Sequence, residues 1–76
     1  MKQLVINQND IYKINNIEYF KFTHNNKNLR DINTNLPKND KYILETIAEH
    51  CELDYRGLNK LNLVKLIENS NCLILQ

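Results

Sequence analysis

The residues of this chain that can bind a transition metal or act as a nucleophile pair are two histidines and two cysteines: His24, His50, Cys51 and Cys72. Adjacent His50 and Cys51 on one helix would point about 100° apart, so they do not readily share a metal ion or a hydrogen bond. The sequence contains neither a Cys-x-x-Cys nor a His-x-x-x-His spacing. We therefore predict no metal site, no cofactor and no catalytic residue, and we interpret both cysteines as core residues.

The carboxylates Glu45, Glu49 and Glu52 recur at the three- and four-residue spacing of one helix face. This spacing is typical of a solvated surface, and the alternative is an interaction surface for a basic protein partner. The chain has a single glycine, which excludes a glycine-rich phosphate-binding loop. A chain this short is also not expected to enclose a deep pocket, so we predict a protein that is not an enzyme and has no small-molecule substrate.

Basic side chains gather around a break in the stretch DYRGLNKLNLVKLIE, residues 54–68. A helix that starts after the break would offer backbone N–H groups and the positive end of its dipole to a phosphate. The predicted nucleic-acid contact consists of Arg56, Gly57, Asn59, Lys60 and Lys65, with the cations on phosphate and the glycine permitting the break. The alternative is that these cations are a solvated face that balances the nearby carboxylates.

Charge and composition limit the partners further. The 76 residues include ten basic and nine acidic side chains, for a formal net charge of +1, so nucleic acid would be bound by a local patch and not by bulk attraction. Fourteen asparagines, nine isoleucines and eight lysines are the products of A/T-rich codons. This bias indicates a low-GC bacterium, its phage or a large virus.

The sequence gives no sign of export or membrane insertion. Its first ten residues, MKQLVINQND, lack the apolar centre of a signal peptide, and no apolar run has the length of a membrane span. Two cysteines without a paired or metal-binding pattern are typical of a reducing compartment. We expect a cytoplasmic protein, in the host cytoplasm if it is viral, without a membrane partner.

The clearest structural pattern is a β-hairpin in IYKINNIEYFKFT, residues 11–23. Two β-rich runs flank Asn15-Asn16, and asparagine tolerates the positive φ that a two-residue type I′ turn requires. The predicted cross-strand pairs are Ile14 with Ile17, Lys13 with Glu18, Tyr12 with Tyr19 and Ile11 with Phe20.

In this hairpin Ile11, Phe20 and Phe22 are predicted to face the core. That leaves Tyr12 and Tyr19 as surface rings that stack single-stranded bases or anchor a protein interface.

The remaining segments complete one α+β domain over residues 1–76. The sheet part spans 1–23 and includes a strand at 4–6. Residues 24–40, polar and with Pro37, are predicted to be a long loop with at most a helical turn at 29–33. A helical hairpin spans 41–70: its first helix is capped by Asn39 or Asp40 and ends near Leu53, and its second begins near 59 or 62. Residues 71–76 are a short strand, and whether it pairs with strand 4–6 is left open.

The segment ILETIAEHCELDYRGLNKLNLVKLIENS, residues 43–70, resembles the helix–extended-loop–helix superfamily. That superfamily includes the SAP, LEM and HeH domains and the N-terminal module of transcription terminator Rho. The matching positions are Ile47 and Ala48 in the first helix, Leu53 in the link, Gly57-Leu58 at the break and Leu66-Ile67 in the second helix. The chain departs from the family in having Leu63 where a lysine is usual, and in an acidic first helix. The resemblance implies binding to DNA or RNA, or docking on a chromatin or assembly partner.

The sequence thus predicts a small binding module, encoded by a phage, virus or other mobile element, whose helical hairpin contacts nucleic acid or a nucleoprotein partner. The alternative is a protein-directed inhibitor of a host or defence enzyme, with Tyr12, Tyr19, the 24–40 segment and the acidic helix as its contact surface. A structural or adaptor subunit that self-associates through its strand edges is a third reading.

Overall fold

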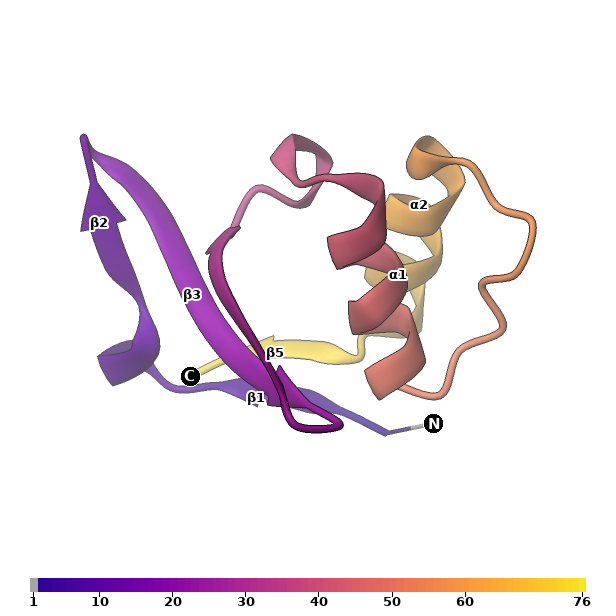
Figure 1. Ribbon diagram of the computed structural model, residues 1–76, viewed down its shortest axis with the longest axis horizontal. Coiled ribbons are helices and arrows are strands. Elements are labelled where there is room, and N and C mark those ends of the chain that lie inside the picture. The colour runs from indigo at the N-terminus through magenta and orange to yellow at the C-terminus, as the bar shows by residue number, and fades with distance from the viewer. Residues whose placement is uncertain (1) are drawn as a thin grey trace.

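The computed structural model describes residues 2–76 and arranges them in two layers (Figure 1). One layer is a three-stranded antiparallel sheet of β2 (Tyr12–Ile14), β3 (Ile17–His24) and β4 (Lys27–Asn33). The other consists of helices α1 (Lys41–His50) and α2 (Lys60–Ser70). A parallel ribbon of β1 (Leu4–Ile6) and β5 (Leu73–Leu75) crosses below both layers in the view of Figure 1. The predicted α+β class is confirmed.

The first hairpin has the predicted turn and register. Asn15 and Asn16 have φ values of 51° and 68°, as a type I′ turn requires. The ladder contains three of the four predicted pairs: Tyr12 with Tyr19, Lys13 with Glu18 and Ile14 with Ile17. β2 begins at Tyr12, so the fourth predicted pair, Ile11 with Phe20, lies beyond the strand.

The prediction of a loop over residues 24–40 is wrong, because most of this segment is regular structure. Asn25 and Asn26 form a second positive-φ turn, at 48° and 64°, and lead the chain into β4. A short 3-10 helix, η2 (Leu36–Lys38), follows, and another, η1 (Gln8–Asp10), precedes β2. The Asn-Asn pair that predicted the first turn occurs again at the second, where it also forms a two-residue turn with positive φ.

A β-bulge in β4 explains why the sequence of this strand lacks the regular alternation of apolar and polar residues that is typical of a strand. The ladder pairs Phe20 with Ile32 and Phe22 with Leu29. Two residues of β4, Arg30 and Asp31, therefore stand opposite Lys21 alone. The extra residue puts Leu29 and Ile32 three positions apart, a helical spacing in sequence. The predicted helical turn at 29–33 is therefore also wrong.

The first 23 residues do not form one sheet, because β1 does not join the hairpin. β1 pairs in parallel with β5 through Leu4 with Leu73, Val5 with Ile74 and Ile6 with Leu75. This result settles the pairing that the sequence left open. The first and last strands of the chain therefore pair in the ribbon that closes one end of the core (Figure 1).

A single core lies between the layers, and all five strands or the turns beside them contribute to it. Phe20 and Ile32 point inward from the sheet and are fully buried, and Ile11 and Phe22 pack against the same core. The predicted inward set of Ile11, Phe20 and Phe22 is thereby confirmed. The other buried apolar residues are Leu4, Ile6, Leu36, Ile43, Leu44, Ile47, Ala48, Cys51, Leu63, Val64, Ile67 and Cys72.

The two residues considered for capping α1 have different roles. Asp40 occupies the N-cap position but makes no side-chain hydrogen bond there. Asn39 is buried, and its side chain accepts from the Asn33 N–H at 2.7 Å and donates to the carbonyls of Asn33 and Leu36 at 2.9 and 3.1 Å. Asn39 therefore joins the end of β4 to η2 and does not cap the helix.

α1 ends at His50, three residues before its predicted end near Leu53. Glu52, with a φ of 60°, lies in the turn that follows. Among residues 2–76, no helix is both long enough and apolar enough to cross a membrane.

Candidate functional site

The break between the helices holds two of the predicted nucleic-acid contacts. Gly57 has a φ of +78°, a backbone region that favours glycine. Arg56 lies beside it and is mostly exposed, with its Nε 3.4 Å from Oδ1 of Asp54. An acidic neighbour therefore balances part of the positive charge predicted for this loop.

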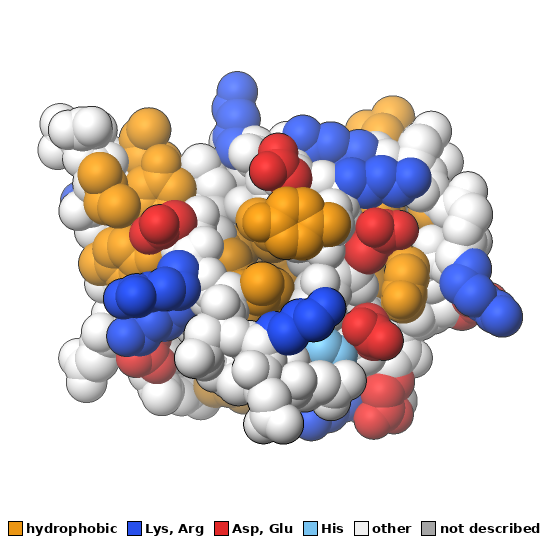
Figure 2. All heavy atoms as spheres, in the orientation of Figure 1, with side chains coloured by type: hydrophobic (Ala, Val, Ile, Leu, Met, Phe, Trp, Pro, Cys, Tyr) orange, Lys and Arg blue, Asp and Glu red, His pale blue; other side chains and the backbone are white. Residues whose placement is uncertain are grey.

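The remaining residues of the predicted contact lie at different places on α2. Asn59 is the N-cap, and its Oδ1 accepts the N–H of Asn62 at 2.9 Å. Lys60 and Lys65 are both exposed, but five residues separate them by about 140° around the helix. α2 therefore does not bring Lys60 and Lys65 to one side of the helix. On the face of the molecule seen in Figure 2, basic and acidic side chains are interspersed.

The predicted acidic surface is only partly open. Glu45 is half-buried on α1, whereas Glu49 and Glu52 are exposed. Glu49 is also engaged, because its Oε2 lies 3.3 Å from Nε2 of His24 at the end of β3. Glu45 and Glu49 lie on α1, as their spacing predicted, but Glu52 lies in the turn after the helix at a positive φ, so the prediction of one helical face for all three carboxylates is wrong at Glu52.

The sheet leaves one of its faces uncovered, and we call this the outer face. The helices pack on the side that carries Phe20 and Ile32 (Figure 1), so alternation along the strands turns the neighbouring side chains away from them. The residues of the outer face include Tyr12, Ile14, Ile17, Tyr19, Lys21, Thr23, Asn28, Arg30, Asp31 and Asn33. Both tyrosines that the sequence assigned to the surface lie there.

The Tyr12 side chain reaches across the outer face to Asp31. Its hydroxyl donates to Oδ1 of Asp31 at 2.6 Å and accepts the N–H of Asp31 at 2.7 Å. Tyr12 belongs to β2 and Asp31 to β4, and neighbouring strands lie about 4.8 Å apart. The side chain must therefore extend over β3. The Tyr19 ring lies beside it, with centroids 6.1 Å apart and an interplanar angle of 30°.

The same contacts stabilise the bulge and change the chemistry of Tyr12. Asp31 has a φ of 56°, and its N–H is satisfied by the Tyr12 hydroxyl instead of by a ladder partner. Burial raises the pKa of Tyr12 above its usual value of 10.0, and the hydrogen bond to the Asp31 carboxylate raises it further. The Tyr12 hydroxyl therefore stays protonated to a higher pH than that of a free tyrosine.

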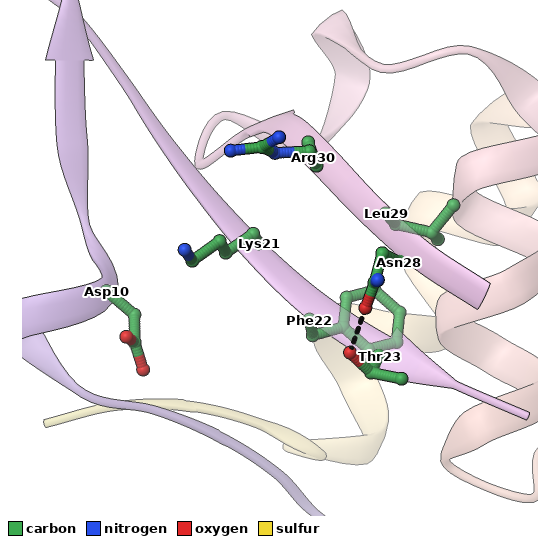
Figure 3. A pocket seen from close by; sticks show the side chains of 7 residues that line it. All are labelled: Asp10, Lys21, Phe22, Thr23, Asn28, Leu29 and Arg30. Atoms are coloured by element: carbon green, nitrogen blue, oxygen red, sulfur yellow. Dashed lines mark hydrogen bonds between the residues drawn. The ribbon is translucent and has the colours of Figure 1, made fainter. Parts of the chain in front are cut away.

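Two cations extend from the outer face beside the tyrosines. Figure 3 shows Lys21 of β3 and Arg30 of β4 reaching to the same side of the sheet, with Asp10 of η1 across the hollow from them. The hollow has a volume of about 440 Å³, and Thr23 and Asn28, bonded to each other at 2.6 Å, form its other end. Neither Lys21 nor Arg30 was singled out from the sequence, because the bulge that aligns them is visible only in the ladder.

His24 and His50 also meet, which the sequence analysis did not foresee. Their Nδ1 atoms lie 3.3 Å apart, and the His50 ring also contacts the edge of Phe22. Burial lowers the pKa of His50 below its usual value of 6.5, and the positive charges of Lys2 and His24 lower it further. Among residues 2–76, no group of three or more His, Cys, Asp and Glu side chains is arranged to hold a metal ion.

The two cysteines lie side by side in the core, not at the surface. Cys51 and Cys72 are both fully buried and are not joined in a disulfide. Burial raises the pKa of Cys51 to about 12, and the adjacent Cys72 thiol adds to this effect. A thiol this basic is not a nucleophile at neutral pH, which agrees with the interpretation of both residues as core residues.

Comparisons with protein-family models, with curated proteins and with solved structures found no match to this chain.

Proposed function

We propose that this protein is a non-enzymatic binding module that holds single-stranded nucleic acid on the outer face of its sheet. The observation that carries the proposal is the stacked pair of Tyr12 and Tyr19 rings, with Lys21 and Arg30 on the same face. Proteins that bind single strands without sequence preference combine aromatic platforms for the bases with cations along the backbone. The outer face offers both within three adjacent strands.

Base stacking supplies most of the affinity under this proposal. Stacking on an aromatic side chain contributes about 1–3 kcal/mol per base. Two phosphate contacts give a log–log salt dependence with a slope of about −1.4 on single strands. If the three cations of the helical hairpin also bound phosphate, five contacts would steepen the slope to about −3.5. The slope therefore distinguishes binding by the sheet alone from binding that includes the hairpin.

Two matched charge reversals test the surface. The sheet variant combines Lys21→Glu with Arg30→Glu on the outer face. The hairpin variant combines Arg56→Glu with Lys60→Glu and makes the same change of charge on the helical hairpin. All four side chains are exposed. The measurement is fluorescence anisotropy with labelled DNA and RNA strands of about 10 nucleotides, and with the corresponding duplexes. We expect the sheet variant to lose about tenfold or more in affinity at low salt and the hairpin variant to lose little.

The other outcomes each have a definite meaning. Loss only in the hairpin variant would reject the outer face and support the helix–extended-loop–helix surface instead. Equal loss in both variants would indicate attraction by net charge without a site. Absence of binding to every probe at low salt would reject nucleic acid as the partner.

A second test addresses the rings. Tyr19→Ala removes one platform without touching the Tyr12–Asp31 hydrogen bonds, and we expect it to weaken binding about 5- to 100-fold. Tyr19→Phe keeps the ring and should retain nearly all of the affinity. A Tyr19→Ala variant that binds like the natural chain would contradict stacking as the source of affinity.

One observation favours a protein partner as the second candidate. Ile14 and Ile17, at the tip of the first hairpin, are each 45% exposed on the same face as the tyrosines. Aromatic and apolar side chains together are typical of the centre of a protein interface. A stoichiometric complex with a protein that is insensitive to salt and lost on Ile17→Asp would support the inhibitor alternative over nucleic-acid binding.

A further inference from the structure

The histidine pair joins the tip of the β3–β4 hairpin to the C-terminal end of α1. His24 is the last residue of β3, and His50 is the last residue of α1. Their Nδ1 atoms face each other at 3.3 Å, with ring centroids 5.3 Å apart and an interplanar angle of 74°. Neutral imidazole has a lone pair on one ring nitrogen, so two facing nitrogens need a proton or a cation between them.

The distances match two imidazoles bound to one tetrahedral ion. Zinc–nitrogen bonds of 2.0–2.1 Å at a tetrahedral angle put the two nitrogens about 3.3 Å apart and the two ring centres about 5.2 Å apart. The observed separations are 3.3 and 5.3 Å. The competing explanation is an N–H···N hydrogen bond, which is also compatible with 3.3 Å, and the ring-nitrogen spectra described below distinguish the two.

The surroundings of His24 provide the support that a ligating histidine usually has. Its other ring nitrogen, Nε2, lies 3.3 Å from Oε2 of Glu49. When Nδ1 binds a metal, Nε2 carries the proton and donates it to a carboxylate or carbonyl, which fixes the ring and increases its basicity. Asn25 Nδ2 lies 3.2 Å from the same Nε2, so the amide would turn its oxygen toward this N–H in the bound form.

We propose that His24 and His50 bind a divalent transition-metal ion, with zinc as the best fit, through both Nδ1 atoms, and that Glu49 orients His24 by accepting from its Nε2–H. The protein supplies two ligands, and water supplies the rest of the tetrahedral shell. Glu49 is a positioning residue and not a ligand. The ion links β3 to α1, so it stabilises the contact between the two layers and leaves the outer face unchanged.

The test is a titration of the full chain with Zn²⁺, with Mg²⁺ as the comparison, because imidazole does not suit the harder ion. Histidine ring ¹⁵N spectra report which nitrogen is bound. We expect the Nδ1 signals of both histidines to shift with Zn²⁺ and not with Mg²⁺. Calorimetry should show one site, and the melting temperature should rise with Zn²⁺ concentration.

Variants separate this site from other zinc ligands. His24→Gln and His50→Gln should each abolish the binding, and Glu49→Gln should weaken it about 10- to 100-fold. Glu45→Gln, on the same helix but without a contact to His24, is the matched control and should bind like the natural chain.

Two results would overturn the proposal. One is that Zn²⁺ leaves both Nδ1 signals in place, which would mean that a shared proton explains the 3.3 Å contact. The other is that binding persists unchanged in His24→Gln, which would point to the thiols. The ring-nitrogen spectrum of the natural chain decides the question even if a variant fails to fold.

Discussion

The Tyr12 hydroxyl makes two hydrogen bonds with Asp31 across the width of the sheet, donating one and accepting the other. The Tyr12 hydroxyl donates to the Asp31 carboxylate at 2.6 Å and accepts the Asp31 N–H at 2.7 Å. One hydroxyl thus satisfies the amide that the bulge removes from the ladder and holds a positive-φ residue in place. This relationship both fixes the proposed platform and stabilises the second hairpin.

Tyr12→Phe tests the stabilising role of the hydroxyl. The variant keeps the ring but leaves the Asp31 N–H and carboxylate without this partner. We expect a loss of about 1–2 kcal/mol in the free energy of unfolding, measured by urea denaturation. Tyr19→Phe, whose hydroxyl makes no comparable bond to Asp31, is the control, and a loss of equal size there would contradict the specific role of Tyr12.

The raised pKa of Tyr12 predicts a stability that falls at alkaline pH. The folded pKa lies above the unfolded value of 10.0, so the folded state holds the phenolic proton more tightly. The contribution is fully present below pH 10 and is lost as the pH rises through the folded pKa. Tyrosinate absorbance should show one tyrosine ionising later than the others, and Tyr12→Phe should remove that late step.

Asn26 tests the second turn, which the sequence analysis missed. It has a φ of 64°, a region that β-branched residues avoid. We expect Asn26→Val to destabilise the protein by about 1–2 kcal/mol and Asn26→Gly to be neutral or slightly stabilising. Thermal denaturation measures both, and equal melting temperatures for Val and Gly would argue against a type I′ turn there.

Asn39 and Asp40 are adjacent, and the structure predicts very different costs for removing their side chains. Asn39→Ala leaves a backbone N–H and two carbonyls without their partner in a buried place, and we expect a loss of about 2–4 kcal/mol. Asp40→Ala removes an N-cap that makes no side-chain bond, so its cost should stay at or below about 0.5 kcal/mol. Denaturant titrations of the two variants give the comparison, and similar losses would refute the assignment of Asn39 as the structural residue.

Cys51 predicts a slow thiol reaction. Its pKa of about 12 and full burial leave almost no accessible thiolate at pH 8. We expect the thiols of the folded protein to react slowly with a disulfide reagent, and both cysteines to react rapidly after denaturation. A fast reaction in the folded state, at a rate unaffected by low denaturant, would contradict the burial of this pair.

The sequence determined the local structure wherever one rule acted alone. The Asn15-Asn16 turn and its register followed from the tolerance of asparagine for positive φ and from the alternation of the flanking residues. The helical periods fixed both helices, and burial of the two cysteines followed from their apolar setting. The same rule applied at Asn25-Asn26, but the polar composition of the following residues concealed it.

Only the tertiary structure decided what depends on distant residues. In the β4 bulge, Tyr12, nineteen residues away, satisfies the Asp31 amide, and the bulge places Arg30 and Asp31 opposite Lys21. His24 meets His50 only because the second hairpin folds onto the last turn of α1. Neither contact leaves a periodic trace in the sequence, since each joins elements whose separation along the chain is set by the packing of the layers. For this reason the sequence predicted the tyrosines of the candidate site but not the cations beside them, and neither histidine contact.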